Sequence, residues 1–432
     1  MYKYSDFNFH DENEDSITIF NSYTCKLYRF KGKGKKDIKE IIEGNINNDD
    51  MQFLNYLLKA NILVDKNVDE TQVMLDRRKD IIDNKDTLFL TILVTMYCNF
   101  QCRYCCEDTS ENSIMNINVQ NIILEFIEKN VSKYKKLVIS WFGGEPMLEI
   151  KTIEYMSQKI KEICKKYHVL YIATITTNGY LLDDKMMKRT LKCNIISYCI
   201  TIDGLPKVHD LQRPLKNGKG TWETIMNNLR RIRDNSSNHL FNIILRTNVT
   251  TEFIKDYKEY ILFLKSEFEQ DLRFHFMWKK AEDWGNIEPE DLYLIEGMDP
   301  YYDFLDKKKS LGLRDDLTVA TLDIKDRICL TSLKNALVIY PDGRVSKCSR
   351  DVKKEITTIG VAKDLIEKPQ QLLDIDLIEN NLTNCFECNR NKLCFGLTCP
   401  IENIECLYDI SYFKKMISSI DDKDIAGNIY CG

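Results

Sequence analysis

The sequence predicts an α/β fold built around a partial, TIM-like β/α barrel with six strands, and two observations support this prediction. Six continuous apolar segments of strand length occur in the middle of the chain, each followed by a loop that contains Gly or small polar residues. Amphipathic helical patterns, such as 118–129 and 221–233, lie between these segments. Buried strands that alternate with helices form parallel sheets. The expected strands are 88–94, 137–141, 169–175, 195–202, 242–249 and 272–277.

A chain of 432 residues is long enough for the barrel and for a further region on each side of it. We expect the barrel over 86–300, with its chemistry in the loops at the carboxyl ends of the strands. Residues 301–432 are cysteine-dense and contain short strands and turns, such as the turn at Pro341–Gly343. Residues 1–85 are expected to form a small winged-helix-like module and a linker.

The amino-terminal module is predicted from its changing hydrophobic pattern. The expected elements are a hairpin at 16–30, amphipathic segments near 38–42 and 51–60, a short strand at 61–65 that forms a wing, and a helix or linker at 69–85. The basic stretch Lys31–Lys36 is interpreted as a solvated turn.

The composition is that of a folded protein without a nucleic-acid or membrane partner. The net charge is -5, and no basic face dominates the sum. The chain shows no amino-terminal apolar signal segment and no apolar run of membrane-spanning length, so we expect a cytoplasmic protein. Sixteen cysteines are too many for disulfides in a reducing compartment, so they indicate metal or redox chemistry.

A C-x3-C-x2-C loop made of Cys98, Cys102 and Cys105 follows the first barrel strand directly. Three thiolates so close together can face one small centre, and soft sulfur ligands suit iron–sulfur clusters or zinc. Because a cluster normally has four protein ligands, three cysteines suggest one iron that is open to an exogenous ligand. The alternative is a zinc knuckle. The adjacent Cys106 is interpreted as a bystander.

This loop resembles the cluster-binding signature of the radical S-adenosylmethionine (SAM) superfamily. The resemblance implies a catalytic 4Fe–4S cluster whose open iron binds the amino and carboxylate groups of SAM. It also implies cleavage of SAM to methionine and a 5'-deoxyadenosyl radical. Tyr104 stands where the superfamily has an aromatic residue close to the adenine of SAM.

The second strand ends in a segment that resembles the GGEP motif of the superfamily, with Gly143, Gly144 and Glu145. Two glycines let the backbone approach a ligand closely, and carbonyls with a nearby carboxylate accept hydrogen bonds from an ammonium group. Alone, such a segment is a common turn. After the cysteine loop, it predicts the site of the SAM amino group.

Two later segments, T-T-N-G at 176–179 and T-I-D-G with H-D and R over 201–213, resemble motifs of the superfamily branch that modifies peptides and proteins. The resemblance implies that Thr201 contacts the ribose or carboxylate of SAM. It also implies that Arg213 pairs with the carboxylate, which suits a planar guanidinium. The Asn and Asp of these segments have the alternative role of capping turns.

The tail resembles the seven-cysteine SPASM pattern, which implies two auxiliary 4Fe–4S clusters and three clusters in all. The seven cysteines are Cys329, Cys348, Cys385, Cys388, Cys394, Cys399 and Cys406. The gap from Cys394 to Cys399 is one residue longer than usual and the next gap is short, so the final ligand stays open between Cys406 and Cys431. A C-x2-C-x5-C group by itself also suits zinc.

The same resemblance implies how these ligands are divided. Cys385, Cys388, Cys394 and Cys406 would hold the outer cluster, and Cys329, Cys348 and Cys399 the inner one. The inner cluster would then lack one cysteine ligand, and Asp323 is the nearest candidate for the fourth ligand. An open iron there would face the barrel and bind a substrate thiolate.

The remaining cysteines lie in apolar or helical surroundings, where free cysteine is most often a small buried hydrophobe. They are Cys25, Cys164, Cys193 and Cys199. His275, in the sixth strand, either points into the barrel or is a satisfied core histidine.

We therefore expect a radical SAM enzyme that modifies a ribosomally made precursor peptide, with a thioether crosslink as the first expectation. The amino-terminal module resembles the element by which such maturases bind a leader peptide through strand addition. An electron donor such as flavodoxin or ferredoxin is implied. A carbon–carbon crosslink or an epimerisation is equally compatible with the motifs.

Two further alternatives remain. An anaerobic sulfatase maturase makes formylglycine, but such proteins usually place the cluster loop close to the amino terminus, whereas 97 residues precede Cys98 here. The non-enzymatic alternative is an iron–sulfur electron carrier.

Overall fold

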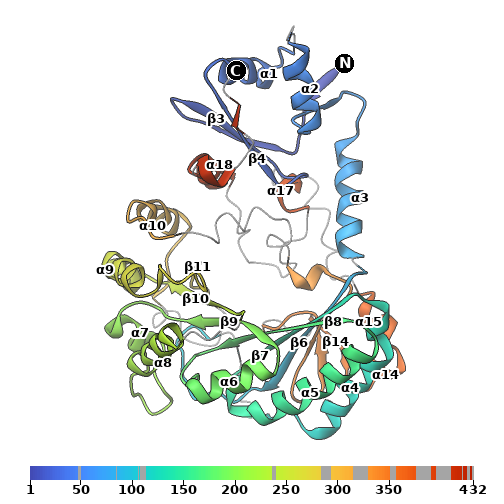
Figure 1. The fold of residues 1–432 in the computed structure, drawn as a ribbon, viewed down its shortest axis with the longest axis vertical. Helices are drawn as coiled ribbons and strands as arrows, with labels where there is room; N and C mark the ends of the chain where they lie inside the picture. Colours follow the sequence, from blue (N-terminus) through green and yellow to red (C-terminus); the bar gives the residue numbers. More distant parts are fainter. Residues whose placement is uncertain are drawn as a thin grey trace. The chain divides into compact units, whose positions relative to one another are not determined.

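The structure is a computed structural model that describes residues 1–46, 50–83, 85–105, 107, 113–235, 240–283, 293–314, 329–350, 357–375, 391–395, 410–420, 422–425 and 429–430 (Figure 1). The chain forms two compact units. The first contains Met1–Asp83, Thr318–Leu333 and Asp376–Gly432, and the second contains Asn84–Leu317 and Lys334–Ile375. No helix within the described ranges combines the length and the apolar character of a membrane span.

The second unit is built on a nine-stranded sheet in which six consecutive strands are parallel. These six are β6 (Thr87–Thr95), β7 (Lys136–Gly143), β8 (Leu170–Thr177), β9 (Ile195–Thr201), β10 (Asn242–Val249) and β11 (Phe274–Lys280). They are arranged in the order β11-β10-β9-β8-β7-β6, so neighbours in sequence are neighbours in the sheet. The prediction of an α/β fold with a mostly parallel sheet is confirmed, and each predicted strand overlaps an observed one.

Helices cover one side of this sheet (Figure 1). They are α4 (Ile117–Asn130), α5 (Ile150–Lys166), α6 (Asp184–Lys192), α7 (Pro206–Gln212), α8 (Trp222–Asp234) and α9 (Thr251–Phe268). Several begin at a polar cap; the Asn116 side chain, for example, accepts hydrogen bonds from the first free N–H groups of α4. Further helical elements of this unit are η1 (Val131–Lys133), η2 (Pro146–Glu149), α10 (Asp299–Lys309), α14 (Asp364–Glu367) and α15 (Pro369–Leu373).

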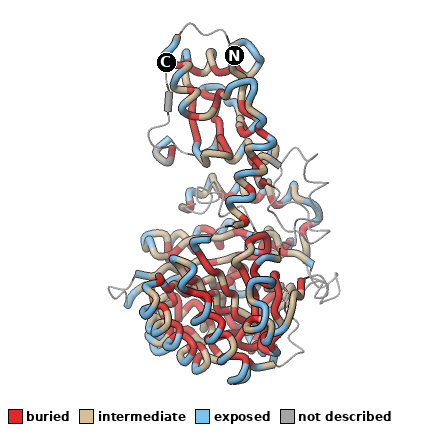
Figure 2. Tube along the Cα trace, turned by 90° about the vertical axis from the view of Figure 1, so that its right-hand side faces the viewer, coloured by how far each residue is buried: buried red, intermediate tan, exposed pale blue. Residues whose placement is uncertain are grey.

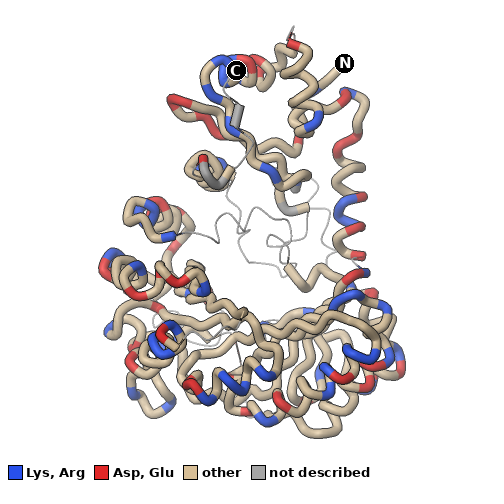
Figure 3. The backbone as a smooth tube through the Cα atoms, in the orientation of Figure 1, with Lys and Arg blue, Asp and Glu red and all other residues tan. Residues whose placement is uncertain are grey.

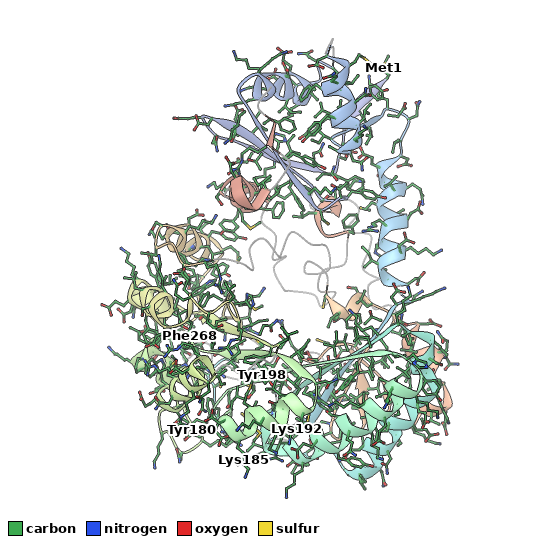
Figure 4. The ribbon with its side chains drawn as sticks, viewed as in Figure 1. Met1, Tyr180, Lys185, Lys192, Tyr198 and Phe268 are labelled. Atoms are coloured by element: carbon green, nitrogen blue, oxygen red, sulfur yellow. The ribbon has the colours of Figure 1, made fainter. Side chains whose placement is uncertain are left out.

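The strands have two unlike faces because successive side chains of a strand point to opposite sides. On β7, Leu137, Ile139 and Trp141 are fully buried, whereas the residues between them are half-buried. Figure 2 shows buried and exposed residues along the Cα trace. Tyr198 of β9 is also fully buried and bonds Thr190 of α6 (2.8 Å), whereas Lys185 of α6 is exposed (Figure 4). We call the face opposite to the helices the inner face.

Three further strands extend the sheet beyond β6. They are β12 (Ala336–Ile339), parallel to β6, and the antiparallel β13 (Arg344–Ser346) and β14 (Thr358–Val361). The predicted turn at Pro341–Gly343 joins β12 to β13, and Gly343 has a φ of 90°, which favours glycine. The start of the cysteine-dense region thus continues the barrel sheet.

The first unit contains a four-stranded sheet in the order β15-β4-β3-β2. Its strands are β2 (Asn8–Glu12), β3 (Ser16–Asn21), β4 (Lys26–Lys31) and β15 (Ile429–Tyr430). The predicted hairpin is confirmed as β3–β4, but the predicted short strand, β5 (Leu63–Asp65), pairs with β1 (Tyr2–Tyr4) instead. The helices are α1 (Gly32–Ile42), α2 (Met51–Lys59), α3 (Glu70–Ile82), α17 (Asn391–Cys394) and α18 (Ile410–Ser418), with short turns η4 (Leu330–Ser332) and η6 (Asp422–Ile425).

The interpretation of Lys31–Lys36 as a solvated turn is wrong, because α1 begins at Gly32. Basic residues at a helix amino terminus interact unfavourably with the helix dipole, but in α1 the packing of apolar side chains outweighs this effect. Ile38 and Ile41 are fully buried in the core of this unit, and Lys35 pairs with Glu12 of β2 (3.1 Å).

Residues near the carboxyl end of the chain complete the amino-terminal sheet. Phe413 of α18 packs against Phe9 and Phe20, and β15 runs parallel to β4. Arg29 of β4 is buried and pairs with Asp422 (2.6 Å). The region predicted as 301–432 therefore contributes to both units. The three-domain division and the winged-helix likeness stay predictions.

We expect the buried pair of Arg29 to stabilise the first unit far more than the neighbouring pair of Lys31 with the same carboxylate. Arg29 also donates to the carbonyls of Ser418 (3.0 Å) and Ile420 (2.7 Å), which lose their partner on substitution. Arg29→Met should lower the local opening free energy of β4 by about 2–4 kcal/mol. The control Lys31→Met, at a partly exposed position, should cost less than about 1 kcal/mol.

Hydrogen exchange of the β4 and α18 amides measures both effects. Equal protection in the two variants would contradict the role assigned to Arg29.

Candidate active site

The cysteine loop leaves the carboxyl end of β6 and is bound along its length to the segment that follows α7. Phe100 forms a β-bridge with Leu215 and is almost fully buried. The Arg103 N–H donates to the carbonyl of Gln212, the last residue of α7 (3.0 Å), and the Gln101 N–H donates to the carbonyl of Pro214 (2.9 Å). Backbone hydrogen bonds, rather than the cysteines themselves, therefore fix the course of the loop.

The three thiols of the loop share one buried environment. Burial raises the pKa of Cys98, Cys102 and Cys105 to about 12, and each thiol responds to the charge of another of the three. The Cys98 sulfur also accepts the N–H of Phe100 (3.4 Å). Neutral thiols must lose their protons to bind iron, so cluster assembly at this loop releases protons.

Within the described ranges, no three His, Cys, Asp or Glu side chains converge on a single metal ion. A 4Fe–4S cluster does not need such convergence, because each cysteine binds a different iron.

The two glycines after β7 allow a close approach to the end of β6. A Cβ atom at Gly143 would lie 2.3 Å from the Thr95 carbonyl oxygen, and one at Gly144 would lie 2.3 Å from that of Tyr97. Gly144 and Glu145 donate their N–H groups to these same two carbonyls (2.9 Å each). The glycines are thus required by backbone packing at the root of the cysteine loop, a reason that the sequence does not reveal.

Glu145 is fully buried and connects the ends of β7 and β8. Its carboxylate accepts hydrogen bonds from Thr177 Oγ1 (2.8 Å), the Asn178 N–H (2.7 Å) and the Met147 N–H (3.0 Å). Burial raises the pKa of Glu145, and these donors oppose the rise. Asn178 Nδ2 in turn donates to Asn99 Oδ1 of the cysteine loop (2.8 Å). The G-G-E-P and T-T-N-G segments therefore form one connected structure.

A second buried carboxylate, that of Asp203 after β9, connects the cysteine loop to β10. The hydroxyl of Tyr104 donates to Asp203, which also accepts the Asn248 N–H (2.8 Å). Burial raises the pKa of Tyr104, which keeps its hydroxyl protonated. Arg213 Nη1 donates to the oxygen of Tyr104 (2.7 Å), so two residues predicted from the sequence to face SAM lie together.

Arg213 is 8% exposed, and its Nε atom has no acceptor among the described residues. A buried guanidinium with a free N–H is suited to a carboxylate ligand. This orphan donor is the feature of the structure that best fits the carboxylate of SAM.

The histidine of the same segment holds Arg213 in place. Nδ1 of His209 accepts the Asp203 N–H (3.2 Å), so the proton lies on Nε2, which donates to Thr221 Oγ1 (3.1 Å). Thr221 then donates to the Arg213 carbonyl (2.8 Å). Burial and, after it, the charge of Arg213 lower the pKa of His209 well below its usual range, so the ring is neutral.

Asp210 has a capping role, because its carboxylate accepts the N–H groups of Thr221 (2.8 Å) and Trp222 (2.9 Å) at the start of α8. The sequence pattern did not separate such structural members of the segment from ligand-binding ones.

Thr201 lies at the carboxyl end of β9, in register with Arg246 of β10. Sequence reasoning missed Arg246 and Lys279, the charged residues on the inner face near the carboxyl ends of β10 and β11. The signal for Arg246 was a charged residue inside the predicted strand 242–249, whereas Lys279 lies beyond the predicted strand 272–277. The SAM contacts predicted for Tyr104, Gly143, Gly144, Glu145, Thr201 and Arg213 stay predictions.

Only part of the predicted cysteine set in the tail can be placed. Cys348 is buried, and its sulfur accepts the N–H of Arg350 (3.4 Å), two residues further on, as Cys98 does from Phe100. Cys329 instead donates its thiol to Thr331 Oγ1 (3.1 Å). Cys394 ends α17, but its side chain is not described. Residues outside the described ranges are Cys106, Asp323, Cys385, Cys388, Cys399, Cys406 and Cys431.

The other cysteines follow the prediction in part. Cys164 and Cys193 are confirmed as buried members of the hydrophobic core of the second unit. Cys25 and Cys199 are half-buried. His275 occupies a half-buried position that alternates with the core residues of β11, which places it on the inner face.

Comparison with known proteins gives a family match to the Radical SAM superfamily over residues 92–261. A cysteine-type anaerobic sulfatase-maturating enzyme of Clostridium novyi is 26% identical over 362 residues, which cover 75% of this chain and 93% of that protein. The radical SAM cyclopropyl synthase TigE of Paramaledivibacter caminithermalis is 26% identical over 39% of this chain and 37% of its own length.

Two solved structures are similar in fold. A histidine-tagged anSMEcpe with bound AdoMet has a TM-score of 0.56 at 19% identity, over 80% of this chain and all of that one. Streptococcus suis SuiB bound to the precursor peptide SuiA has a TM-score of 0.50 at 14% identity, over 91% of this chain and 94% of that one. At such low identities, both likenesses bear on the fold alone.

The neutral state of His209 predicts a loss of stability in acid. Its pKa is lowered in the folded chain, so the stability that it contributes is complete above the unfolded pKa of about 6.5 and decreases as the pH falls below it. The decrease approaches about 1.4 kcal/mol per pH unit. His209→Asn should flatten this part of the profile, because an amide does not titrate.

Urea unfolding between pH 7.5 and 5.5, followed by tryptophan fluorescence, measures this slope. The control is His168→Asn at an exposed position, which should keep the wild-type slope. An unchanged slope in His209→Asn would show that another group controls acid stability.

Proposed function

Because residues 92–261 form a radical SAM domain, the chain is an enzyme of that superfamily, and we propose that it modifies a ribosomally synthesised precursor peptide. The alternative of an iron–sulfur electron carrier is therefore excluded. The observation that carries the proposal is the arrangement of the four sequence motifs, whose residues are hydrogen-bonded to one another at the carboxyl edge of one parallel sheet.

The superfamily uses SAM and a 4Fe–4S cluster, and the described residues fit this pair. When bound, SAM and the cluster would supply a 5'-deoxyadenosyl radical that abstracts a hydrogen atom from the peptide. Cys98, Cys102 and Cys105 would hold the cluster, and Arg213 would donate to the carboxylate of SAM. Tyr104 would keep Arg213 oriented through the hydrogen bond between them.

Glu145 would serve the amino group of SAM through one remaining acceptor position. A carboxylate offers about four such positions, and three are filled by Thr177, Asn178 and Met147. The first role of Glu145 is thus to align the ends of β7 and β8, and the second is to accept one N–H of the ammonium.

Recognition of the leader peptide is assigned to the first unit. Its strand β2 pairs on one side with β3 and forms the end of the sheet among the described strands. A sheet edge of this kind accepts an extended peptide through backbone hydrogen bonds.

We assign the seven tail cysteines to two auxiliary clusters, the inner one with an open iron, and the electron supply to a flavodoxin or ferredoxin. The N–H bond to the Cys348 sulfur supports this assignment, because cluster sulfurs are tuned by such bonds. An open iron that binds a substrate thiolate favours a thioether product, although carbon–carbon crosslinking and epimerisation use the same radical.

A second candidate function is that of an anaerobic sulfatase maturase, which makes formylglycine. The similarity to the Clostridium novyi protein along 93% of that protein favours it.

The first test of the proposal replaces Cys98, Cys102 and Cys105 together by Ala. We expect this variant to make no 5'-deoxyadenosine from SAM under anaerobic reducing conditions, while iron still binds in the tail. The control is Cys164→Ala, at a core cysteine, which should keep SAM cleavage. Chromatography of the reaction measures the product, and substantial 5'-deoxyadenosine from the triple variant would refute the catalytic assignment.

The second test identifies the product by mass spectrometry of the short peptide encoded nearest to this protein. A thioether crosslink removes two hydrogen atoms and keeps the sulfur, whereas formation of formylglycine from cysteine replaces the sulfur by a carbonyl oxygen. We expect the first result. Formylglycine in a sulfatase-derived peptide, with no change in the encoded peptide, would favour the second candidate function.

A further inference from the structure

Two cations lie on the inner face beyond the residues predicted to hold SAM. In β10 and β11, Asn248 is aligned with Lys279 and Arg246 with Met277. Arg246 and Asn248 are two residues apart and share a face, so Lys279 lies on that face as well. Both cations are near the carboxyl ends of their strands, at the edge of the sheet that carries the cysteine loop.

Charges are unusual at these positions. In the second unit, Lys, Arg, Asp and Glu are concentrated on the helices, and the strands are mostly uncharged (Figure 3). Lys280, the neighbour of Lys279, points to the other face and its ammonium group donates to the carbonyls of Ile295 (3.4 Å) and Gly297 (3.3 Å).

For Lys279, in contrast, no hydrogen bond or ion pair with a described residue is found, although the residue as a whole is partly accessible to solvent. Partial removal from bulk water lowers its pKa, and the nearby cations Arg246 and Arg350 lower it further. Two cations therefore act on Lys279, which is unfavourable unless an anion binds close to it.

The described residues supply little negative charge to Arg246 and Lys279. Arg246 donates to the neutral Asn248 Oδ1 (2.9 Å), and the carboxylate whose pKa it affects is Asp203. Asp203 already accepts hydrogen bonds from Tyr104 and from the Asn248 N–H, and it also interacts with Arg213. The positive charge of Lys279 is thus not compensated among the described residues.

The SAM contacts predicted from the sequence do not include Arg246 or Lys279. The residues predicted to contact SAM follow β6, β7 and β9, and the strand order places β10 and β11 beyond β9. The two cations consequently face the part of the inner face where a substrate, rather than the cofactor, would lie.

We propose that Arg246 and Lys279 form a substrate subsite that binds a carboxylate of the peptide close to the residue that is modified. The inference rests on the proposed function and adds the chemical class of the bound segment. The planar guanidinium of Arg246 would form directed hydrogen bonds to the carboxylate, and the flexible ammonium of Lys279 would add a second positive charge. The carboxylate is that of an Asp or Glu side chain or of the peptide's carboxyl terminus.

The test uses the full-length enzyme, reconstituted with clusters and SAM, and three acetylated peptides of five residues. The first is Gly-Gly-Asp-Gly-Gly amide, the second has Asn in place of Asp, and the third has Asn and a free carboxyl terminus. Affinities are measured by ligand-observed NMR. We expect the Asp peptide, the free-terminus peptide or both to bind about tenfold more tightly than the neutral peptide.

Which of the two charged peptides gains affinity identifies the source of the carboxylate. Lys279→Met and Arg246→Gln should each abolish the preference, whereas the matched control Lys280→Met should keep it. Lys279→Glu should bind a peptide with Lys in the central position in preference to the Asp peptide. Circular dichroism verifies that each variant is folded.

Three results would overturn the proposed subsite. They are equal binding of all three peptides, binding of none of them, and a preference that is retained in both Lys279→Met and Arg246→Gln. A separate measurement tests the proposed function. If that function is wrong, the wild-type enzyme incubated with SAM and no peptide would make no 5'-deoxyadenosine.

Discussion

The buried carboxylate of Asp203 is the contact on which the candidate site depends. It joins the cysteine loop through Tyr104, β10 through the Asn248 N–H, and Arg213 through the shared hydroxyl of Tyr104. A buried carboxylate is costly unless its hydrogen bonds are made. Because these bonds come from segments far apart in the chain, the cost is offset only when the loop, the sheet and Arg213 are all in place.

Glu145 is a second buried carboxylate that connects separate segments. Together the two carboxylates hold the cysteine loop at two different residues. Glu145 fixes Thr177 and Asn178, and Asn178 reaches the loop through Asn99. Partner-rich buried networks are rigid, and a site that must place one C–H bond against a radical needs rigidity. The inner face beyond β9 differs from this network, because Lys279 has no partner there among the described residues.

The fold of the second unit was largely predictable because its signals are local. A buried parallel strand such as 88–94 is mostly apolar whatever surrounds it, and the structure has β6 over Thr87–Thr95. The start of α1 was not predictable from charge, since Lys33, Lys35 and Lys36 indicate solvent. Burial of Ile38 and Ile41 against the sheet outweighs that local signal, and this burial exists only in the folded unit.

The sequence by itself determined that this protein carries a radical SAM domain, because the spacing of Cys98, Cys102 and Cys105 and the order of the later motifs follow from covalent connectivity. Only the tertiary structure decided which motif residues are supports. His209 proves to be a neutral positioning residue, and Gly144 proves to be required by a backbone contact. The pairing of Arg29 with Asp422, 393 residues away, likewise has no trace in the sequence. Such roles depend on distances between atoms that are remote in the chain, and those distances are set by packing.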